Sequence, residues 1–365
     1  MTHAPENAPP PLRLLFWEST ARCNLACAHC RRLDVAAAAA REDLTTEEFR
    51  AVLDSTATLG RPIIVFSGGE PLMRNDWQEL AAHAASLGLP TALATNGTMV
   101  DEALARRIAA AGFRRVSVSL DGADAATHDA FRRVDGSFDR ALAGIAALRS
   151  VGAAVQVNAT IAAHNVEQLD GLYALAVSVG AEALHLFLLV PVGCGVEIER
   201  THQLPARRYE QVLEWALDRQ EAGGLELKAT CAPHYYRLAA QRGRALGHSR
   251  GCLGGLAVAF VSHKGELFPC GYLPVQCGSV RERPFAEIWR DSDVFGDLRD
   301  FERLKGKCGR CDFKGICGGC RARAYALTGD YLAAEPACTY RPPRPGGPRA
   351  PENDATSTGG GGSAW

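Results

Sequence analysis

The chain has 365 residues, 47% of them hydrophobic and 22% charged, which suits one large or two medium globular domains. Its formal net charge of −1 argues against a general attraction to nucleic acid or anionic membranes. No apolar stretch is long enough to cross a bilayer, and the polar, proline-rich start lacks a secretion signal pattern. We therefore expect a cytoplasmic protein with no nucleic-acid or membrane partner.

Thirteen cysteines in a reducing compartment favour metal ligation over disulfides. Cys23, Cys27 and Cys30 follow the predicted first strand, 12–17, in the spacing C-x3-C-x2-C. Three thiolates can hold three irons of a [4Fe–4S] cluster and leave the fourth iron open for a small chelating molecule. A zinc site usually takes four ligands, so zinc explains this triplet less well.

Strands and helices alternate through the next part of the chain. Further strands are predicted at 61–66, 91–95, 116–120, 155–161 and 184–190, and helices at 45–59, 77–87, 101–111, 137–150 and 166–179. Six strand-then-helix units predict a parallel sheet with helices outside, and they are fewer than an eight-fold barrel needs. The expected fold class is α/β, a partial (β/α)6 TIM-like barrel with its site at the C-terminal ends of the strands.

Polar residues follow these strands at the edge where such a barrel forms its site. Ser67, Gly68, Gly69 and Glu70 come directly after the second strand. The glycines let the backbone approach a ligand closely, and the Glu70 carboxylate can accept a hydrogen bond from an amine. Candidates at later strand ends are Asn96, Ser117, Ser119, Asp121, Arg132, Asn158 and Thr160, although each alone is also a common turn or cap residue.

A cysteine-rich segment begins near residue 230. Two CxxC pairs, Cys308–Cys311 and Cys317–Cys320, together with Cys252, Cys270 and Cys338 make seven thiols, more than one zinc ion explains. We expect residues 12–229 to form the barrel, 230–341 to form a C-terminal extension, and 1–11 and 342–365 to be disordered.

Cys231 and His234 lie with two tyrosines where the barrel and the extension should meet. They could ligate a metal, line a substrate pocket, or pack at the start of a helix. A basic run follows, consisting of Arg237, Arg242, Arg244, His248 and Arg250. Such a run is usually a solvated face, but arginines beside an active site also pair well with substrate carboxylates.

The cysteine triplet and the Ser67–Pro71 turn together resemble the radical S-adenosylmethionine (SAM) superfamily. The resemblance implies that Cys23, Cys27 and Cys30 hold a cluster whose open iron binds SAM, and that SAM is split reductively to a 5′-deoxyadenosyl radical. It implies SAM contacts from His29, Ser67, Gly68, Gly69, Glu70, Asn96, Ser119, Asp121, Arg132 and Asn158. His29 stands where the family most often has an aromatic ring, and we expect its imidazole to stack on the adenine.

The later cysteines resemble the SPASM extension of this superfamily, which carries auxiliary [4Fe–4S] clusters. The resemblance implies that one auxiliary cluster is bound by Cys308, Cys311, Cys317 and Cys338, and the other by Cys252, Cys270 and Cys320. Full ligation needs one thiolate more than these positions supply. The second cluster then has an open iron, a non-cysteine ligand or a thiol from elsewhere, with Cys194, Cys231 and Cys277 unassigned. Alternatively, that cluster is never built and only one auxiliary cluster exists.

Residues 12–341 resemble the heme synthases of the siroheme-dependent heme pathway, and more loosely the enzymes of heme d1 formation. The similar stretches are 14–18, 27–31, 187–191, 228–237, 270–273 and 317–325. This resemblance implies an enzyme that decarboxylates two propionates of iron-coproporphyrin III oxidatively to the vinyl groups of heme b. The basic run would face the porphyrin carboxylates, and Cys231 or His234 would act catalytically near the porphyrin iron.

The same resemblance implies a tetrapyrrole substrate and a low-potential electron donor such as ferredoxin or flavodoxin. An auxiliary cluster is a suitable acceptor for the electron left after each decarboxylation. Two alternatives stay open: a SPASM maturase that modifies a ribosomal precursor peptide, and a non-catalytic iron–sulfur electron carrier. A carrier would not need the Ser67–Pro71 turn beside the cysteine triplet.

Overall fold

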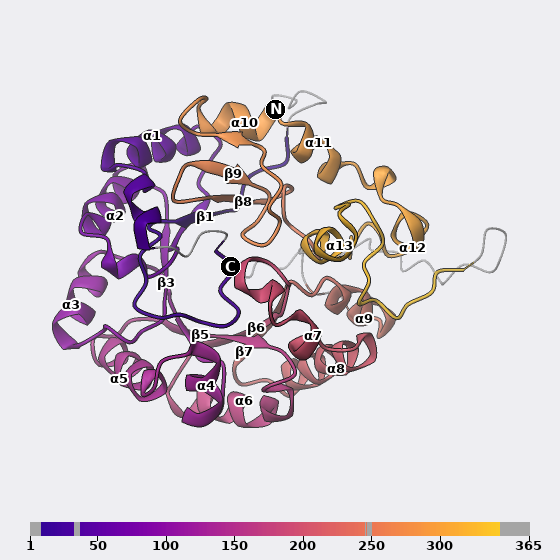
Figure 1. The fold of residues 1–365 in the computed structure, drawn as a ribbon, viewed down its shortest axis with the longest axis horizontal. Coiled ribbons are helices and arrows are strands. Elements are labelled where there is room, and N and C mark those ends of the chain that lie inside the picture. Colours follow the sequence, from indigo (N-terminus) through magenta and orange to yellow (C-terminus); the bar gives the residue numbers. More distant parts are fainter. Residues whose placement is uncertain (1–8, 33–36, 245, 247–249, 344–365) are drawn as a thin grey trace.

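The computed structural model describes residues 9–32, 37–244, 246 and 250–343. Most of the segments predicted to be disordered, 1–11 and 342–365, lie outside the described residues, and so does His248 of the basic run. In Figure 1 the described chain forms a curved sheet with helices arranged around its outer side. Within the described residues, no helix combines the length and the apolar character needed to cross a membrane.

One sheet contains all the named strands, in the order β10-β9-β8-β1-β2-β3-β4-β5-β6-β7. The strands β1 to β8 run parallel to their neighbours, and the short β9 and β10 add an antiparallel edge beyond β8. Their bounds are β1 Leu14–Glu18, β2 Ile63–Ser67, β3 Thr91–Thr95, β4 Val116–Ser119, β5 Val155–Ile161, β6 Ala183–Leu188, β7 Glu226–Thr230, β8 Val258–Val261, β9 Glu266–Phe268 and β10 Gly278–Ser279.

Helices that follow the strands in sequence lie around the outer side of the sheet, whereas the last helix lies inside this ring (Figure 1). Their bounds are α1 Thr46–Ala57, α2 Trp77–Ser86, α3 Glu102–Ala110, α4 Ala125–Arg132, α5 Ser137–Ser150, α6 Leu169–Ser178, α7 Glu199–His202, α8 Ala206–Ala222, α9 His234–Gln241, α10 Phe285–Asp291, α11 Asp293–Arg299, α12 Gly306–Gly309 and α13 Arg321–Thr328. Capping residues in the sequence explain where some helices begin: Thr45 and Glu48 form a reciprocal capping box at the N-terminus of α1, and Asp101 caps α3.

The predicted fold class, a partial barrel of parallel strands, is confirmed. The structure adds β7 and β8 to the six predicted strands, and β8 pairs with β1 although the two lie far apart in sequence, with Leu14 opposite Val258. The sheet therefore runs across the boundary predicted at 229/230, and the exact domain limits stay a prediction.

The core lies between the sheet and the outer helices, whereas the concave side of the sheet lines a cavity. On β1, Leu15 and Trp17 are fully buried beneath the helices, and the Trp17 ring stacks on Phe49 of α1 with centroids 3.3 Å apart. Leu14 and Phe16 point to the other side and line the cavity, as the two-residue period of a strand requires.

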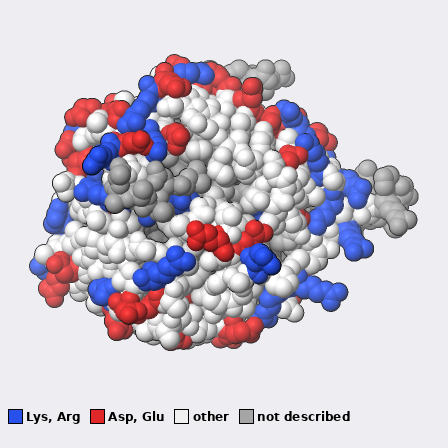
Figure 2. Space-filling model, viewed as in Figure 1, with Lys and Arg blue, Asp and Glu red and all other residues white. Residues whose placement is uncertain are grey.

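Charged side chains of both signs are interspersed over the outer helices around the rim of the face shown in Figure 2. This face carries no broad field of one sign.

Candidate active site

A cavity of about 490 Å³ occupies the concave side of the sheet. This volume falls within the usual range of ligand pockets, about 300–1,000 Å³. Inward-facing residues from β1 to β8 line the cavity, and the three cysteines of the N-terminal triplet lie in its wall. Of the predicted SAM contacts, His29, Ser67, Gly68, Gly69, Asn96, Ser119, Arg132 and Asn158 all line it. The structure therefore gathers most of the predicted site into one place.

The loop that carries Cys23, Cys27 and Cys30 is held against the turn after β2 by backbone hydrogen bonds. The Gly69 amide donates to the Thr20 carbonyl (2.9 Å), and the Glu70 amide donates to the Arg22 carbonyl (2.7 Å). A Cβ on Gly69 would lie 2.1 Å from the Arg22 carbonyl oxygen, so only glycine permits this approach. The two glycines thus fix the backbone next to Cys23.

Glu70 departs from the expectation that its carboxylate faces the bound amine. The side chain is fully buried, is not among the residues that line the cavity, and accepts from the Thr95 hydroxyl and the Asn96 amide, both at 2.8 Å. Burial raises the pKa of Glu70 to about 7 despite these hydrogen bonds. In this arrangement the carboxylate ties the turn after β2 to the end of β3, and the backbone of the turn faces the cavity.

The three thiols fit a cluster better than a single metal ion. Among the described residues, no group of three His, Cys, Asp or Glu side chains could hold one ion. A [4Fe–4S] cluster needs no such convergence, because each thiolate binds a different iron. Arg32 donates from Nε to Cys30 Sγ (3.3 Å), and Arg132 donates from Nη1 to Cys27 Sγ (3.6 Å). Cations so placed suit thiolates that a bound metal keeps deprotonated.

Asp121 and Arg132 form a buried ion pair beside this loop, with Arg132 Nη2 2.7 Å from Asp121 Oδ2. The Thr160 amide also donates to Asp121 Oδ1 (2.7 Å). Burial alone would raise the pKa of Asp121, but Arg132 together with His29 and His128 lowers it to about 2. The pair therefore stays charged, and it links the ends of β4 and β5 to the cysteine loop.

His29 is stacked within a column of rings. Its imidazole lies parallel to the Phe131 ring with centroids 4.2 Å apart, and Phe131 stacks in turn on His164 at 3.7 Å. One face of His29 is thus occupied by protein. The imidazole lines the cavity, and its contact with adenine stays a prediction.

Asn96 and Asn158 are held by neighbouring side chains. The Asn96 amide group donates to Asn24 Oδ1 (2.8 Å), and Asn158 Oδ1 accepts from Gln156 Nε2 (2.6 Å). Gln156 also contacts His185 on β6 (3.0 Å), so polar side chains continue along the cavity wall away from the cysteines.

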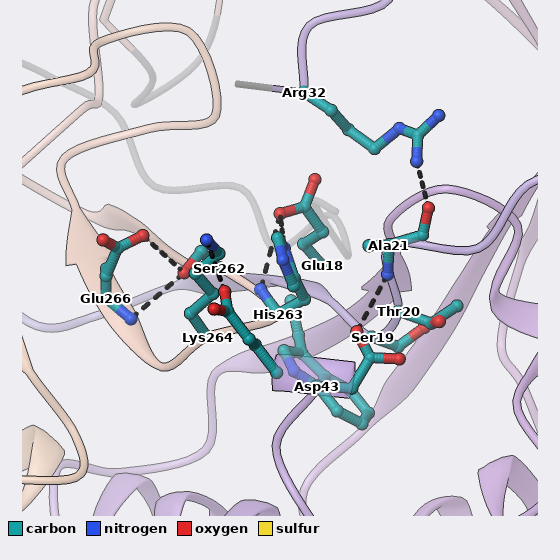
Figure 3. A network of polar contacts seen from close by, with 12 residues as sticks. Glu18, Ser19, Thr20, Ala21, Arg32, Asp43, Ser262, His263, Lys264 and Glu266 are labelled. Carbon is teal, nitrogen blue, oxygen red and sulfur yellow. Dashed lines mark hydrogen bonds and ion pairs between the residues drawn. The ribbon is translucent and has the colours of Figure 1, made fainter. Parts of the chain in front are cut away.

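Glu18, at the end of β1, connects the cysteine loop with the C-terminal part of the chain. His263 Nδ1 lies 2.9 Å from Glu18 Oε2 (Figure 3), and Arg31 lies 3.9 Å from Glu18 Oε1. Arg31 also stacks over Phe260 of β8 at 4.4 Å and donates to the Ser67 hydroxyl (3.3 Å). These contacts hold Arg31 in the cavity wall, directly after the last cysteine of the triplet.

The seven later cysteines separate into the two predicted sets. Cys308, Cys311, Cys317 and Cys338 surround one small cavity, and Cys252, Cys270 and Cys320 line the large one. Cys231 lies with the second set, in the wall of the large cavity. His234 does not: it is fully buried and lines the small four-cysteine cavity. A role for His234 near a substrate iron in the large cavity does not fit this position.

A buried ion pair connects the two cysteine sets. Arg323 Nη1 lies 3.5 Å from Glu335 Oε2, and both side chains are fully buried. The same carboxylate oxygen accepts from the Cys320 amide (2.7 Å), while the Glu335 amide donates to Cys308 Sγ (3.3 Å).

Most of the basic run does not face the cavity, which corrects the expectation drawn from sequence. Arg237 pairs with Glu210, Arg242 with Asp218 (2.5 Å) and Arg244 with Glu221 (2.6 Å), all acidic residues of α8. The two helices α8 and α9 pack together, which places these pairs away from the large cavity. Arg237 is buried and lines the small four-cysteine cavity instead. Only Arg250 among the described residues of the run lines the large cavity.

Other cations line the cavity instead. Its wall contains eight Lys or Arg side chains and one carboxylate, Glu226, among the described residues. The cations are Arg31, Arg32, Arg114, Arg115, Arg132, Lys228, Arg250 and Arg321. A signal for two of them was present in the sequence, since Arg115 directly precedes β4 and Lys228 lies within β7.

Comparison with known proteins agrees with this architecture. Residues 17–176 match the sequence pattern of the radical SAM superfamily, and residues 252–312 match the SPASM iron–sulfur cluster-binding domain. The chain belongs to the radical SAM superfamily, in the group with a C-terminal SPASM domain. The chain is therefore an enzyme of a class that uses [4Fe–4S] clusters and SAM.

Among curated relatives, it is 47% identical to the AdoMet-dependent heme synthase of Methanosarcina barkeri, over 94% of this chain and 98% of the relative. It is 44% identical to the AdoMet-dependent heme synthase of Nitratidesulfovibrio vulgaris, over 93% of this chain and 95% of the relative. The PqqA peptide cyclase of Xanthomonas campestris is 34% identical over 96% of this chain and 92% of the relative.

Solved structures support the fold. SuiB of Streptococcus suis, bound to its precursor peptide SuiA, superposes with a TM-score of 0.73 at 17% identity, covering 90% of this chain and 76% of that chain. The protein anSMEcpe with bound AdoMet has a TM-score of 0.66 at 18% identity, covering 88% of this chain and 94% of that chain.

Proposed function

We propose that this chain converts iron-coproporphyrin III to heme b by oxidative decarboxylation of two propionates. The proposal is supported by the full-length similarity to AdoMet-dependent heme synthases. A further relative, a protein from M. barkeri that is 32% identical to this chain, is named Fe-coproporphyrin III synthase. One structural observation supports the substrate class: eight Lys or Arg side chains and a single carboxylate line the cavity next to the cysteine triplet. Three of these cations, Arg31, Arg115 and Arg132, pair with carboxylates of the chain, so cations remain in excess. A porphyrin with four propionates has the complementary charge.

In this proposal, Cys23, Cys27 and Cys30 ligate the cluster that binds SAM, and the seven later cysteines ligate auxiliary clusters. When bound, the cluster and SAM supply a 5′-deoxyadenosyl radical that removes a hydrogen atom from the propionate β-carbon. Loss of carbon dioxide and of one electron then leaves a vinyl group.

The residues of the chain would bind SAM and the porphyrin and orient them toward each other. Ser67, Gly68, Gly69 and Asn96 line the cavity together with the cysteine triplet, where SAM would lie. Lys228, farther along the wall, would hold a propionate and so help to fix which side chain approaches the radical. Arg115 lines the same wall but pairs with Glu226 (3.1 Å). We further propose a ferredoxin or flavodoxin as electron donor, and the auxiliary cysteine sites as the place that receives the surplus electron.

The test is an assay with anaerobically reconstituted protein, a reductant, iron-coproporphyrin III and at least two SAM molecules per porphyrin, because each decarboxylation consumes one SAM. We expect 5′-deoxyadenosine together with a porphyrin that has lost two carboxyl groups and the matching hydrogens, read by mass spectrometry. Formation of 5′-deoxyadenosine without any mass loss from the porphyrin would exclude this substrate. The metal-free coproporphyrin serves as a matched control for the role of the iron.

A peptide-modifying activity is the second candidate. The similarity to the PqqA peptide cyclase favours it, since it also spans nearly the whole chain, but at 34% rather than 47% identity. Turnover of a precursor peptide, with no reaction of the porphyrin, would select this candidate over heme formation.

A further inference from the structure

Cys231 directly follows β7 and lies in the wall of the large cavity with three of the SPASM cysteines. Its side chain packs, with that of Cys270, against a small buried cluster that contains Cys320 and Leu273. Cys252 also lines this cavity, and its thiol is close enough to Cys231 to act on it electrostatically. Four thiols from segments far apart in sequence therefore lie near one another.

The backbone of Cys231 is held in a conformation that cysteine rarely adopts. Its φ is +56°, one of two positive values for non-glycine residues in the described chain. The Cys231 carbonyl accepts from the Tyr209 hydroxyl (2.8 Å) and from Arg323 Nη2 (3.1 Å), both on buried side chains. Such a conformation persists only where the surroundings impose it, and here they turn the thiol toward the cavity wall.

The segments around the four thiols interlock closely. A Cβ on Gly251, next to Cys252, would lie 2.4 Å from the Cys317 carbonyl oxygen and 2.7 Å from Pro233 Cβ. The Cys252 amide donates to the Cys317 carbonyl (3.1 Å), and Gly254 lies against Cys270. The chain after Cys231 is thus packed directly onto the chain before Cys252.

The electrostatics agree with this proximity. Burial raises the pKa of the Cys231 thiol well above its ordinary value, and Cys320, Cys270 and Cys252 raise it further. The other two unassigned cysteines lie elsewhere: the Cys194 amide donates to the Cys30 carbonyl (2.9 Å), and the Cys277 amide donates to Leu267 (2.7 Å) beside β9.

We propose that Cys231 is the fourth thiolate of the iron–sulfur cluster bound by Cys252, Cys270 and Cys320. The inference rests on the proposed assignment of auxiliary clusters to the extension. It supplies the one thiolate that the SPASM positions lack, so this cluster has no open iron. Substrate and SAM then have no coordination site there, and the cluster only transfers electrons.

The test uses the full chain, purified and reconstituted anaerobically as Cys231→Ala and Cys231→Ser variants. We expect Cys231→Ala to lose about four irons, the content of one cluster, or to show the electron paramagnetic resonance (EPR) signal of a [3Fe–4S] cluster after mild oxidation. Cys231→Ser should retain more iron with an altered EPR spectrum, because an alkoxide can replace a thiolate. Cys194→Ala and Cys277→Ala are matched controls that should keep wild-type iron and spectra.

Wild-type iron, sulfide and EPR spectra in Cys231→Ala would overturn the proposal. Cys252→Ala distinguishes the role of Cys231 as a ligand from the existence of the cluster itself. If Cys252→Ala loses a cluster and Cys231→Ala does not, Cys231 is not a ligand; if neither does, no cluster exists at this place and the proposal also fails. Because these readouts involve no porphyrin, they are independent of whether heme formation is observed. Retention of SAM cleavage by the variants shows that the barrel is folded.

Discussion

At the scale of single residues, the site depends on buried charges and rings that hold one another. Arg132 contacts both Asp121 and Cys27, so the same guanidinium serves the ion pair and the cysteine loop. His128 helps to hold the backbone of Asp121, because its Nδ1 accepts a hydrogen bond from the Asp121 amide (3.1 Å). An imidazole that accepts at this position must be neutral.

His128 gives a prediction about pH. Burial and the nearby Arg132 lower the pKa of His128 to about 4, whereas an unfolded histidine titrates near 6.5. Between these values the folded state binds fewer protons, so stability falls as pH decreases from about 6.5 toward 4. The slope from this residue is at most about 1.4 kcal/mol per pH unit.

Urea unfolding at several pH values measures this slope. His128→Asn keeps an acceptor close to the Nδ1 position but does not titrate, so its stability should depend less on pH than that of wild type. An identical pH dependence in the two proteins would contradict the assignment.

Lys228 tests the cationic lining. It lies on β7 in the cavity wall, where burial lowers its pKa and an incoming carboxylate would raise it again. Lys228→Met should raise the KM for iron-coproporphyrin III about tenfold, the equivalent of about 1.4 kcal/mol of binding. SAM cleavage without porphyrin should be unchanged. The control is Lys264→Met, which removes a lysine that pairs with Glu42 outside the cavity. Equal KM values in the two variants would exclude Lys228 from the substrate site.

At the scale of elements, the sequence predicted local structure well. The observed β3, α5 and β5 have the predicted bounds, because strong apolar periodicity and flanking glycines mark them. The short α4, whose apolar residues are alanines and Phe131, was missed, and so was the 17-residue α8. The contacts of the basic run could not be foreseen, since the pairing of α9 with acidic residues of α8 depends on tertiary packing.

Gly69 links one element to the site. Gly69→Ala would place a methyl group on the Arg22 carbonyl and displace the loop that carries Cys23. We expect lower iron content of the N-terminal cluster and a fall of about 100-fold in 5′-deoxyadenosine formation, since shifts of about 1 Å have such effects. The matched control is Gly296→Ala on α11, where an added Cβ meets open space. Normal iron and activity in Gly69→Ala would show that the loop tolerates movement.

At the scale of the whole molecule, the pairing of β8 with β1 brings the extension onto the barrel. Sequence alone predicted the two cysteine sets by resemblance, but it gave Cys231 a catalytic role and assigned it to no cluster, because its neighbours Cys252, Cys270 and Cys320 are close only in space. It also placed His234 beside the substrate, whereas the fold directs it to the other cysteine set.

This arrangement predicts that the cluster sites can be removed separately. A Cys23/Cys27/Cys30 triple alanine variant should lose about four irons and all SAM cleavage, and should keep the iron bound by the later cysteines. Iron and sulfide analysis with EPR measures both. Loss of all iron would instead mean that the extension cannot assemble without the N-terminal centre.

The ion pair of Arg323 with Glu335 has a consequence for redox behaviour. One carboxylate residue is hydrogen-bonded to a cysteine of each set, inside a dry interior where charges are weakly screened. If clusters form at both cysteine sets, an electron added to one would change the midpoint potential of the other through this shared residue, and the two centres would act as a coupled relay.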